Sequence, residues 1–146
     1  MRLYLDTSAL VKLYVDEEDA RVVRNAVGQA DLIATSALAH VEARAAFARR
    51  RREGGLSPGD HRRITRDLDR DWAGYLSVEV TDAVIRRGAR LSETHRLKAY
   101  DAVHLASAAV AHGRLGEPFL FASWDRNLDR AARREGLALL RAPDRD

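Results

Sequence analysis

The sequence predicts an α/β fold in which a central parallel sheet is covered by helices on both faces. Short apolar segments alternate along the chain with longer segments that have the apolar periodicity of helices. This alternation is typical of βαβ units, whose parallel strands are buried between two helical layers. The chain has 146 residues and no internal repeat, low-complexity tract or proline-rich linker. We therefore expect residues 1–146 to form a single domain.

Local signals predict the individual elements. Ser57 and Pro58 are a typical N-cap and first helical residue, and the glycines at 54–55, 113 and 136 favour helix ends. The predicted strands are residues 2–6, 32–35, 78–80, 119–122 and 137–140. The predicted helices are residues 8–15, 20–27, 36–52, 58–72, 82–94, 99–111 and 125–134. The order of the strands in the sheet does not follow from this pattern.

Composition limits the class of protein. The chain has no cysteine, which excludes disulfides and thiolate metal sites. The apolar start meets Asp6 too early to be a signal peptide, and no apolar run approaches the ~20 residues of a membrane helix. We therefore expect a cytoplasmic protein that does not enter a membrane.

The charge balance is basic and rests on arginine. The formal net charge is +3, the pI is about 9.7, and Lys12 and Lys98 are the lysines of the chain. Arginine suits phosphate groups because its guanidinium offers two parallel donors. An anionic partner and the coding bias of a GC-rich genome both explain this composition.

Two acids directly follow predicted strands. Asp6 ends the strand at residues 2–6, and Asp125 comes shortly after the strand at residues 119–122. A carboxylate beside apolar segments costs free energy unless it is paired or bound to a metal. Ligands of parallel sheets bind beyond the carboxyl ends of the strands. The structural alternative for both acids is the N-cap of the following helix, with Ser123 as a second candidate cap.

A third acid lies in the long helix after the second strand. Leu38, Val41 and Ala45 have the spacing of an apolar helical stripe, and Glu42 borders it. An acid at the edge of the apolar face of a helix indicates a functional role. The alternative is a boundary glutamate that pairs with an arginine.

The fourth acid opens an alanine-rich helix. Asp101 is surrounded by apolar residues, and His104 shares its helix face. The alternative role for Asp101 is a favourable charge near the helix N-terminus. We interpret His104 as a core residue with satisfied hydrogen bonds rather than a ligand. Asp129 has Arg133 four residues later, which predicts an exposed ion pair.

Together the four acids would repel one another at one end of a sheet. Two unit charges about 4 Å apart cost about 4 kcal/mol at an effective dielectric constant of about 20. A divalent cation removes this repulsion, and magnesium or manganese prefers carboxylates together with water and phosphate. One or two such ions can activate water and hold a phosphodiester for hydrolysis. Spacing alone does not bring the four acids together, so this step depends on the fold.

Four segments of the chain carry a resemblance to one family. Residues 3–14 (LYLDTSALVKLY) resemble the opening of PIN-domain toxins of the VapC type, and Thr35, Ser36 and Glu42 resemble their second motif. Residues 97–108 (LKAYDAVHLASA) are similar to the third and most specific motif, and residues 121–128 (FASWDRNL) to the fourth. The motifs come in the family's order and spacing and span nearly the whole chain.

The resemblance implies a PIN-like α/β/α sandwich with a central parallel sheet of about five strands. It identifies Asp6, Glu42, Asp101 and Asp125 as the catalytic and metal-binding acids, with Mg²⁺ or Mn²⁺ as the ion. It places Ser8 and Ser123 where small hydroxyl residues order those acids. The implied function is an endoribonuclease that is the toxin of a toxin–antitoxin pair, with RNA as substrate, a small VapB-like antitoxin as partner, and a homodimer as the usual assembly.

The mechanism implied by the resemblance is hydrolysis by an activated water. Asp6, Asp101 and Asp125 would bind the ion directly or through water, and Glu42 would bind a second ion or orient the attacking water. In-line attack at phosphorus would leave 5′-phosphate and 3′-hydroxyl ends. Trp124 departs from the smaller or more varied residues common in the family, and we expect it to pack against the fold. The alternatives are that it narrows the groove or stacks on a base.

Contacts with RNA or with a partner are assigned to two further features. Arg49, Arg50 and Arg51, with Arg52 and the pair at 62–63, could grip an RNA backbone through charge. A partner-binding surface or a solvated face are the alternatives for these arginines. The helix pair between Ser36 and Trp72 could present a groove to an antitoxin peptide.

Other functions fit the pattern less well. The main alternative is a catalytically silent PIN-like module that binds RNA or protein, although all four acids are present. A phosphoacceptor receiver domain needs an acid pair after the first strand, and an Asp-x-Asp phosphatase needs a second aspartate. Thr7 and Ser8 follow Asp6 and argue against both. A nuclease that cleaves DNA stays open, because phosphate chemistry does not distinguish the two sugars.

Overall fold

A five-stranded parallel sheet forms the centre of the computed structural model, which describes residues 1–141. The strand order is β3-β2-β1-β4-β5. The strands are β1 (Arg2–Leu5), β2 (Leu32–Ser36), β3 (Leu76–Val78), β4 (Phe119–Ala122) and β5 (Ala138–Leu139). All neighbouring pairs are parallel, which confirms the predicted α/β class and its parallel sheet.

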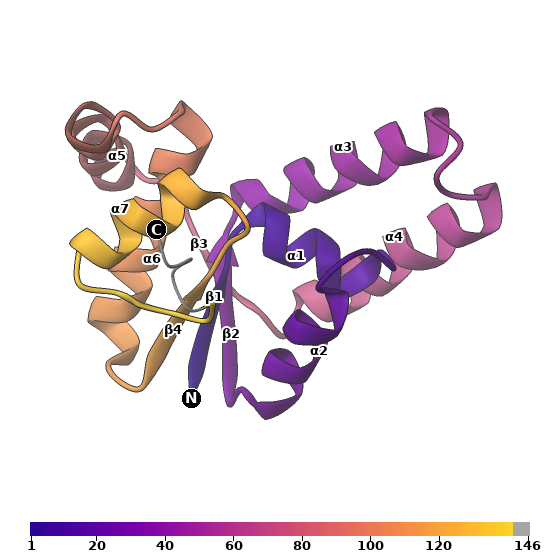
Figure 1. Cartoon of the computed structure of the whole chain (residues 1–146), viewed down its shortest axis with the longest axis horizontal. Helices are drawn as coiled ribbons and strands as arrows, with labels where there is room; N and C mark the ends of the chain where they lie inside the picture. Colours follow the sequence, from indigo (N-terminus) through magenta and orange to yellow (C-terminus); the bar gives the residue numbers. More distant parts are fainter. Residues whose placement is uncertain (142–146) are drawn as a thin grey trace.

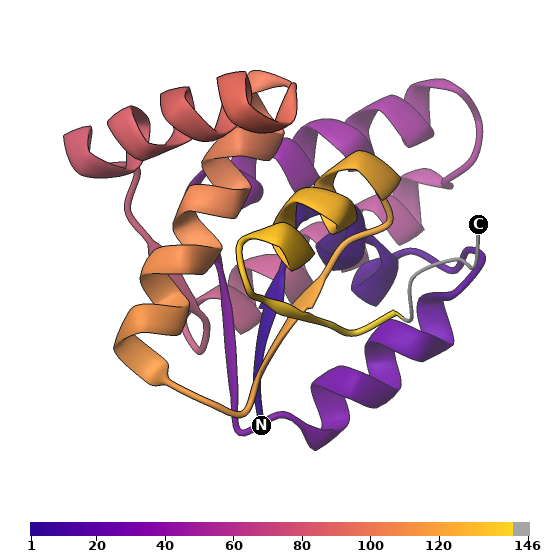
Figure 2. The same cartoon turned by 60° about the vertical axis from the view of Figure 1, so that its left-hand side comes forward.

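Two helical layers enclose the sheet (Figures 1 and 2). One layer consists of α1 (Thr7–Tyr14), α2 (Ala20–Gln29), α3 (Leu38–Arg52) and α4 (Pro58–Trp72). The other consists of α5 (Asp82–His95), α6 (Ala99–Leu115) and α7 (Arg126–Arg134). In Figure 1 the α3–α4 pair projects away from the sheet on the side opposite α5 and α6.

Alternation along β1 divides the interior into two cores. Leu3 and Leu5 pack with α1, α2, α3 and α4, whereas Tyr4 packs with α5, α6 and α7. The Tyr4 ring stacks on Phe121 of β4 with centroids 5.6 Å apart. Successive side chains of a strand point to opposite faces, so a central strand buried on both sides is apolar throughout. This explains the continuous apolar character of the first segment.

The buried face of α3 differs from the predicted stripe. Ala39, Ala43 and Phe47 face the core, whereas Val41 is 59% exposed. The prediction based on Leu38, Val41 and Ala45 was therefore wrong. Small alanines let α3 approach the neighbouring helices closely, and Phe47 supplies the bulk. Glu42 precedes Ala43 and lies at the edge of this true face, half-buried.

Three predicted element boundaries shift for physical reasons. Ser36 ends β2 rather than opening a helix, because its backbone pairs with Val78. The third strand is correspondingly at Leu76–Val78, two residues before its predicted place. Helix α6 continues through Gly113 and ends at Gly116, which has a φ of 69°. That left-handed conformation favours glycine and stops the helix, whereas Gly113 does not.

The direction of the chain gathers several helix N-termini at one edge of the sheet. Helix α1 follows β1, α3 follows β2, and α7 follows β4, all three strands being parallel. Each of these helices therefore begins at the carboxyl ends of the strands. This is the edge at which open α/β sheets bind ligands. Within residues 1–141, no helix is long and apolar enough to cross a bilayer.

Candidate active site

Asp6 is fixed at the carboxyl end of the central strand. Its side chain is almost fully buried and caps α1, with Oδ1 accepting hydrogen bonds from the Ala9 amide at 2.9 Å and from Ser8 Oγ at 2.7 Å. Ser8 Oγ also accepts a hydrogen bond from the Trp124 amide at 2.9 Å. Ser8 therefore connects the Asp6 carboxylate at the end of β1 to the segment that follows β4.

Asp125 has the same arrangement at the end of the neighbouring strand. Its Oδ1 caps α7 by accepting a hydrogen bond from the Leu128 amide at 2.8 Å. Ser123 Oγ accepts a hydrogen bond from the Asp125 amide at 3.0 Å. Asp6 and Asp125 are thus both N-caps, as expected from the structural role that was the alternative to a functional one. Each cap uses Oδ1, and within residues 1–141 no protein donor engages Oδ2 of either carboxylate.

Asp101 lies in the first turn of α6 and interacts electrostatically with both of these acids. Burial, and then the negative charges of Asp125 and Asp6, raise the pKa of Asp101. The charges of Asp6 and Asp125 are therefore close enough to oppose ionisation of Asp101. Such a set of hard oxygen donors fits Mg²⁺ or Mn²⁺, which takes one or two carboxylates and keeps several waters. Within residues 1–141, no three acidic or histidine side chains form a ready-made cage around one point.

Glu42 approaches from the opposite helical layer. Its Oε1 accepts hydrogen bonds from Thr7 Oγ1 at 2.8 Å and from His104 Nε2 at 2.9 Å. Burial opposes ionisation, but the hydrogen bonds from His104 and Thr7 hold the pKa of Glu42 below its ordinary value. Glu42 is thus ionised at neutral pH, and its partner is a histidine rather than the arginine that the structural alternative assumed.

Comparison with known proteins agrees with this architecture. The model of the PIN domain family matches residues 3–134, a range that contains all four sequence motifs. Ribonuclease VapC45 of Mycobacterium tuberculosis (strain CDC 1551 / Oshkosh) is 36% identical over 135 residues, which cover 92% of this chain and 91% of the relative. The chain is a PIN-domain protein of the VapC type. The resemblance predicted from the motifs is confirmed.

Solved structures show the same fold at lower sequence identity. FitAcB from Neisseria gonorrhoeae has a TM-score of 0.66 and 17% identity, covering 94% of this PIN domain and 95% of that chain. A toxin–antitoxin complex from Klebsiella pneumoniae has a TM-score of 0.61 and 14% identity, covering 84% and 86%. At such identities the likeness concerns the fold alone, and it confirms the predicted PIN-like sandwich.

Asp129 is a further acid at this edge of the PIN domain, and sequence reasoning assigned it the wrong partner. Its carboxylate pairs with Arg141 at 2.9 Å rather than with Arg133. Burial raises the pKa of Asp129 to about 6, the Arg141 charge lowers it, and Asp6 and Asp125 raise it slightly. Arg141 lies twelve residues beyond Asp129, so helical spacing gave no signal for this pair.

Trp124 packs against the fold, as predicted. Its indole Nε1 donates to Asp19 Oδ2 at 2.8 Å, and its ring lies 5.3 Å from Lys12 Nζ and 4.8 Å from Arg141 Cζ. Arg141 Nε also donates to the Ser123 carbonyl at 2.9 Å. These contacts fix the segment between β4 and α7, which carries Ser123 and presents Asp125.

The arginine run at the end of α3 divides into two kinds of residue. Arg50 pairs with Glu17 at 2.6 Å and fastens α3 to the α1–α2 connection. Arg49 and Arg51 are exposed at the far end of the α3–α4 pair. At about 1.5 Å of helix rise per residue, Arg49 lies roughly 10 Å along α3 from Glu42. The exposed arginines are thus within reach of a polymer that passes the acids.

The Arg141 contact predicts the titration of Asp129. Replacing Arg141 with glutamine should raise the pKa of Asp129 further above about 6, because burial remains while the lowering charge is lost. A folded pKa above the unfolded value stabilises the fold at low pH, and this stabilisation is lost as pH rises through the folded pKa. In the variant that loss should therefore occur at higher pH than in the wild type.

NMR titration of the Asp129 side-chain carboxyl measures this directly. The matched control is Arg133→Gln, which removes the partner expected from helical spacing and should leave the titration unchanged. A shift in the Arg133 variant together with no shift in the Arg141 variant would contradict the assigned ion pair.

Proposed function

We propose that this PIN domain is a Mg²⁺- or Mn²⁺-dependent endoribonuclease and the toxin of a toxin–antitoxin pair. The observation that carries the proposal is the electrostatic coupling of Asp101 to Asp6 and Asp125 at the carboxyl end of the sheet. The relative from M. tuberculosis is named a ribonuclease, and the similar K. pneumoniae structure is a toxin–antitoxin complex. Both support the same assignment.

The proposed chemistry distributes roles among the four acids. Asp6, Asp101 and Asp125 would hold the ion, with Ser8 ordering the Asp6 carboxylate and Ser123 ordering the Asp125 backbone. When bound, a divalent cation lowers the pKa of a water and stabilises charge on the scissile phosphate and the leaving oxygen. Ionised Glu42 has Oε1 occupied by its two donors, and its Oε2 would orient the attacking water or bind a second ion. No side chain becomes covalently attached, and the products carry 5′-phosphate and 3′-hydroxyl ends.

The proposal extends to the partner and the setting. A cavity of about 780 Å³ lies beside α4, lined by apolar residues of α1, α2 and β2 such as Leu13, Val27 and Ile33, with Ile64 contributed by α4. We propose that a segment of a small antitoxin occupies this groove. The expected groove was between α3 and α4, whereas this cavity uses the other side of α4. A homodimer in the cytoplasm belongs to the same proposal.

Cleavage of RNA by the purified, partner-free chain tests the nuclease. Mg²⁺ or Mn²⁺ should support cleavage, EDTA should abolish it, and Asp101→Asn should lower the rate at least about 100-fold, the order of effect typical of groups that act in the chemical step. The matched control is Asp82→Asn, which also changes a first-turn acid but on the exposed start of α5. This control should leave the rate unchanged.

The product ends and the substrate decide between alternatives. Mapped 5′-phosphate ends support the mechanism, whereas 2′,3′-cyclic phosphate ends would contradict it. A DNA strand of the same sequence, tested in parallel, separates a ribonuclease from a general nuclease. Tight RNA binding without cleavage by well-folded protein would favour the silent binding module instead.

The exposed arginines should act through the RNA backbone. Replacing both Arg49 and Arg51 with alanine is expected to weaken RNA binding and to reduce the slope of log affinity against log salt by about 1 for each lost phosphate contact. Fluorescence anisotropy at several salt concentrations measures this, in the Asp101→Asn background to prevent cleavage. Arg50→Ala is the contrast, because Glu17 holds its guanidinium, and it should change the slope less. An unchanged slope in the double variant would assign these arginines to a solvated or partner-binding face.

A further inference from the structure

A buried histidine links the two helical layers at the edge of the acid cluster. His104 is 2% exposed and lies three residues after Asp101 on α6. Its Nε2 is 2.9 Å from both Glu42 Oε1 and Thr7 Oγ1, and its Nδ1 is 3.0 Å from the Tyr4 hydroxyl. One ring thus contacts α3, α1 and β1 at once. The prediction that His104 is a core residue with satisfied hydrogen bonds is confirmed. Its hydrogen bond to Glu42 was not predicted.

The chemistry of the partners fixes the proton on Nε2. An ionised carboxylate is an acceptor only, so the short contact to Glu42 Oε1 requires a proton on Nε2. The Thr7 hydroxyl donates to the same oxygen. A ring that carries its single proton on Nε2 accepts at Nδ1 from the Tyr4 hydroxyl, whereas a doubly protonated ring donates at both nitrogens; in either form Nε2 donates to Glu42.

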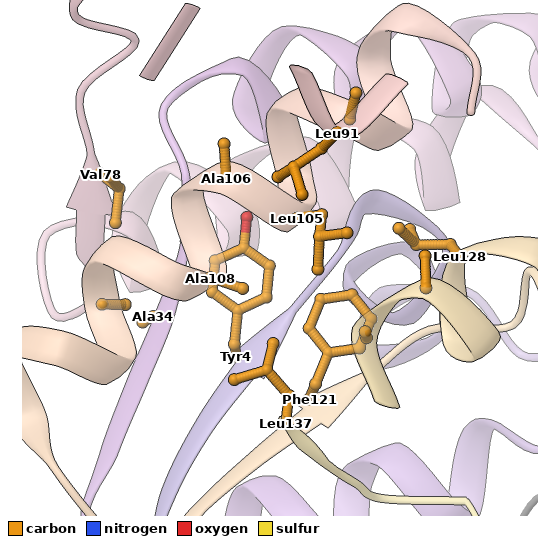
Figure 3. Close-up of a cluster of buried hydrophobic side chains, with 14 of the residues drawn as sticks. Tyr4, Ala34, Val78, Leu91, Leu105, Ala106, Ala108, Phe121, Leu128 and Leu137 are labelled. Atoms are coloured by element: carbon orange, nitrogen blue, oxygen red, sulfur yellow. The ribbon is translucent and has the colours of Figure 1, made fainter. Parts of the chain in front are cut away.

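Tyr4 is suited to this donor role. It is fully buried in the core, and burial together with the charge of Asp6 raises the pKa of its hydroxyl well above the ordinary value. The hydroxyl therefore keeps its proton. Figure 3 shows the Tyr4 ring beside Phe121 with its oxygen directed towards the helix that carries Leu105 and Ala106. Hydrogen bonds thus connect Tyr4 through His104 to Glu42.

We propose that His104 and Thr7 are positioning residues for Glu42. Their hydrogen bonds hold Oε1 of Glu42, so that Oε2 would be available to the ion and the attacking water. This inference rests on the proposed nuclease function. His104 and Asp101 share one face of α6, so the same helix sets the position of Asp101 and, through His104, of Glu42 across the end of the sheet. Outer residues of this kind typically change metal affinity or activity by about 10–100-fold.

The surroundings of His104 argue against simple core filling. Leu105, Ala106 and Ala108 are fully buried apolar neighbours on the same helix. An apolar residue at position 104 would therefore fill the space without the free-energy cost of burying a polar group. A buried polar group is tolerated only when its hydrogen bonds are satisfied, and both ring nitrogens of His104 are. The specific consequence of placing a histidine here is the fixed position of Glu42 Oε1.

A pair of amides separates positioning from packing. His104→Gln can place an amide donor near the site of Nε2 and should retain most of the function, within about 3-fold of wild type. His104→Asn is shorter, keeps a polar group near Tyr4 but does not reach Glu42. We expect the asparagine variant to lower kcat about 10–100-fold with little change in KM, as for a residue that acts in the transition state.

Metal affinity supplies a readout that does not depend on cleavage. Titration of Mn²⁺ followed by electron paramagnetic resonance should show about 10-fold weaker binding for His104→Asn than for wild type, with His104→Gln close to wild type. Circular dichroism checks that both variants fold. Thr7→Val, which keeps the shape of the side chain and removes the second donor to Glu42, should change kcat and Mn²⁺ affinity in the same direction even if the asparagine variant does not fold.

The outcomes separate this proposal from the function on which it rests. Rescue by glutamine, with loss in asparagine, supports the positioning role. The proposal would be overturned if the two amide variants lost kcat and Mn²⁺ affinity equally. It would also be overturned if neither amide variant nor Thr7→Val lost any. A wild-type chain that cleaves no RNA but shows the same order of Mn²⁺ affinities would contradict the nuclease proposal while supporting the positioning of Glu42.

Discussion

The gathering of Asp6, Asp101 and Asp125 at the carboxyl end of the sheet, where the first and last of these charges oppose ionisation of Asp101, is the constraint on which the candidate site depends. Parallel strands send the chain out at one edge, and here adjacent strands β1 and β4 are followed by Asp6 and Asp125. Asp101 enters the same region from α6, and its pKa is raised by the burial and by both charges. Asp6 and Asp125 are each held at this edge by a hydrogen bond from a helix amide three residues further along the chain.

The capping role and the functional role of the strand-end acids are compatible. Asp6 and Asp125 each use one oxygen to satisfy a helix N-terminus. A capped carboxylate is both stabilised and aimed, because the helix amides fix its plane. Glu42 is treated differently, since His104 and Thr7 rather than helix amides take one of its oxygens. The site thus combines Asp101, whose ionisation is opposed by burial and by two neighbouring acids, with Glu42, whose ionised form is favoured by two hydrogen bonds.

The sequence predicted the fold class and the position of most elements because those depend on local periodicity. Buried strands such as residues 119–122 are apolar throughout, and Ser57 with Pro58 begins α4 as predicted. Asp6 and Asp125 were identifiable as strand-end acids by the same local reasoning. Their approach to Asp101 depends on the strand order, which no local pattern contains.

The remaining differences come from contacts between distant parts of the chain. The Glu42–His104 pair joins residues 62 apart, and the buried face of α3 depends on which helices lie beside it. Asp129 of α7 pairs with Arg141, which follows β5 and lies beyond the range of helical spacing. Gly113 was predicted to end α6, but the helix continues to Leu115, and Gly116, with a φ of 69°, follows it. Local signals therefore predict elements better than they predict partners.

Thermal unfolding of the wild type and of Asp101→Asn, with and without Mn²⁺, tests the central claim most directly. Because repulsion raises the pKa of Asp101, removing its charge at neutral pH should raise the metal-free Tm above that of the wild type. Mn²⁺ should raise the Tm of the wild type clearly and that of the variant much less, since only the full cluster gains from the ion. A variant that is less stable than the wild type without metal, and equally stabilised by Mn²⁺, would contradict the account.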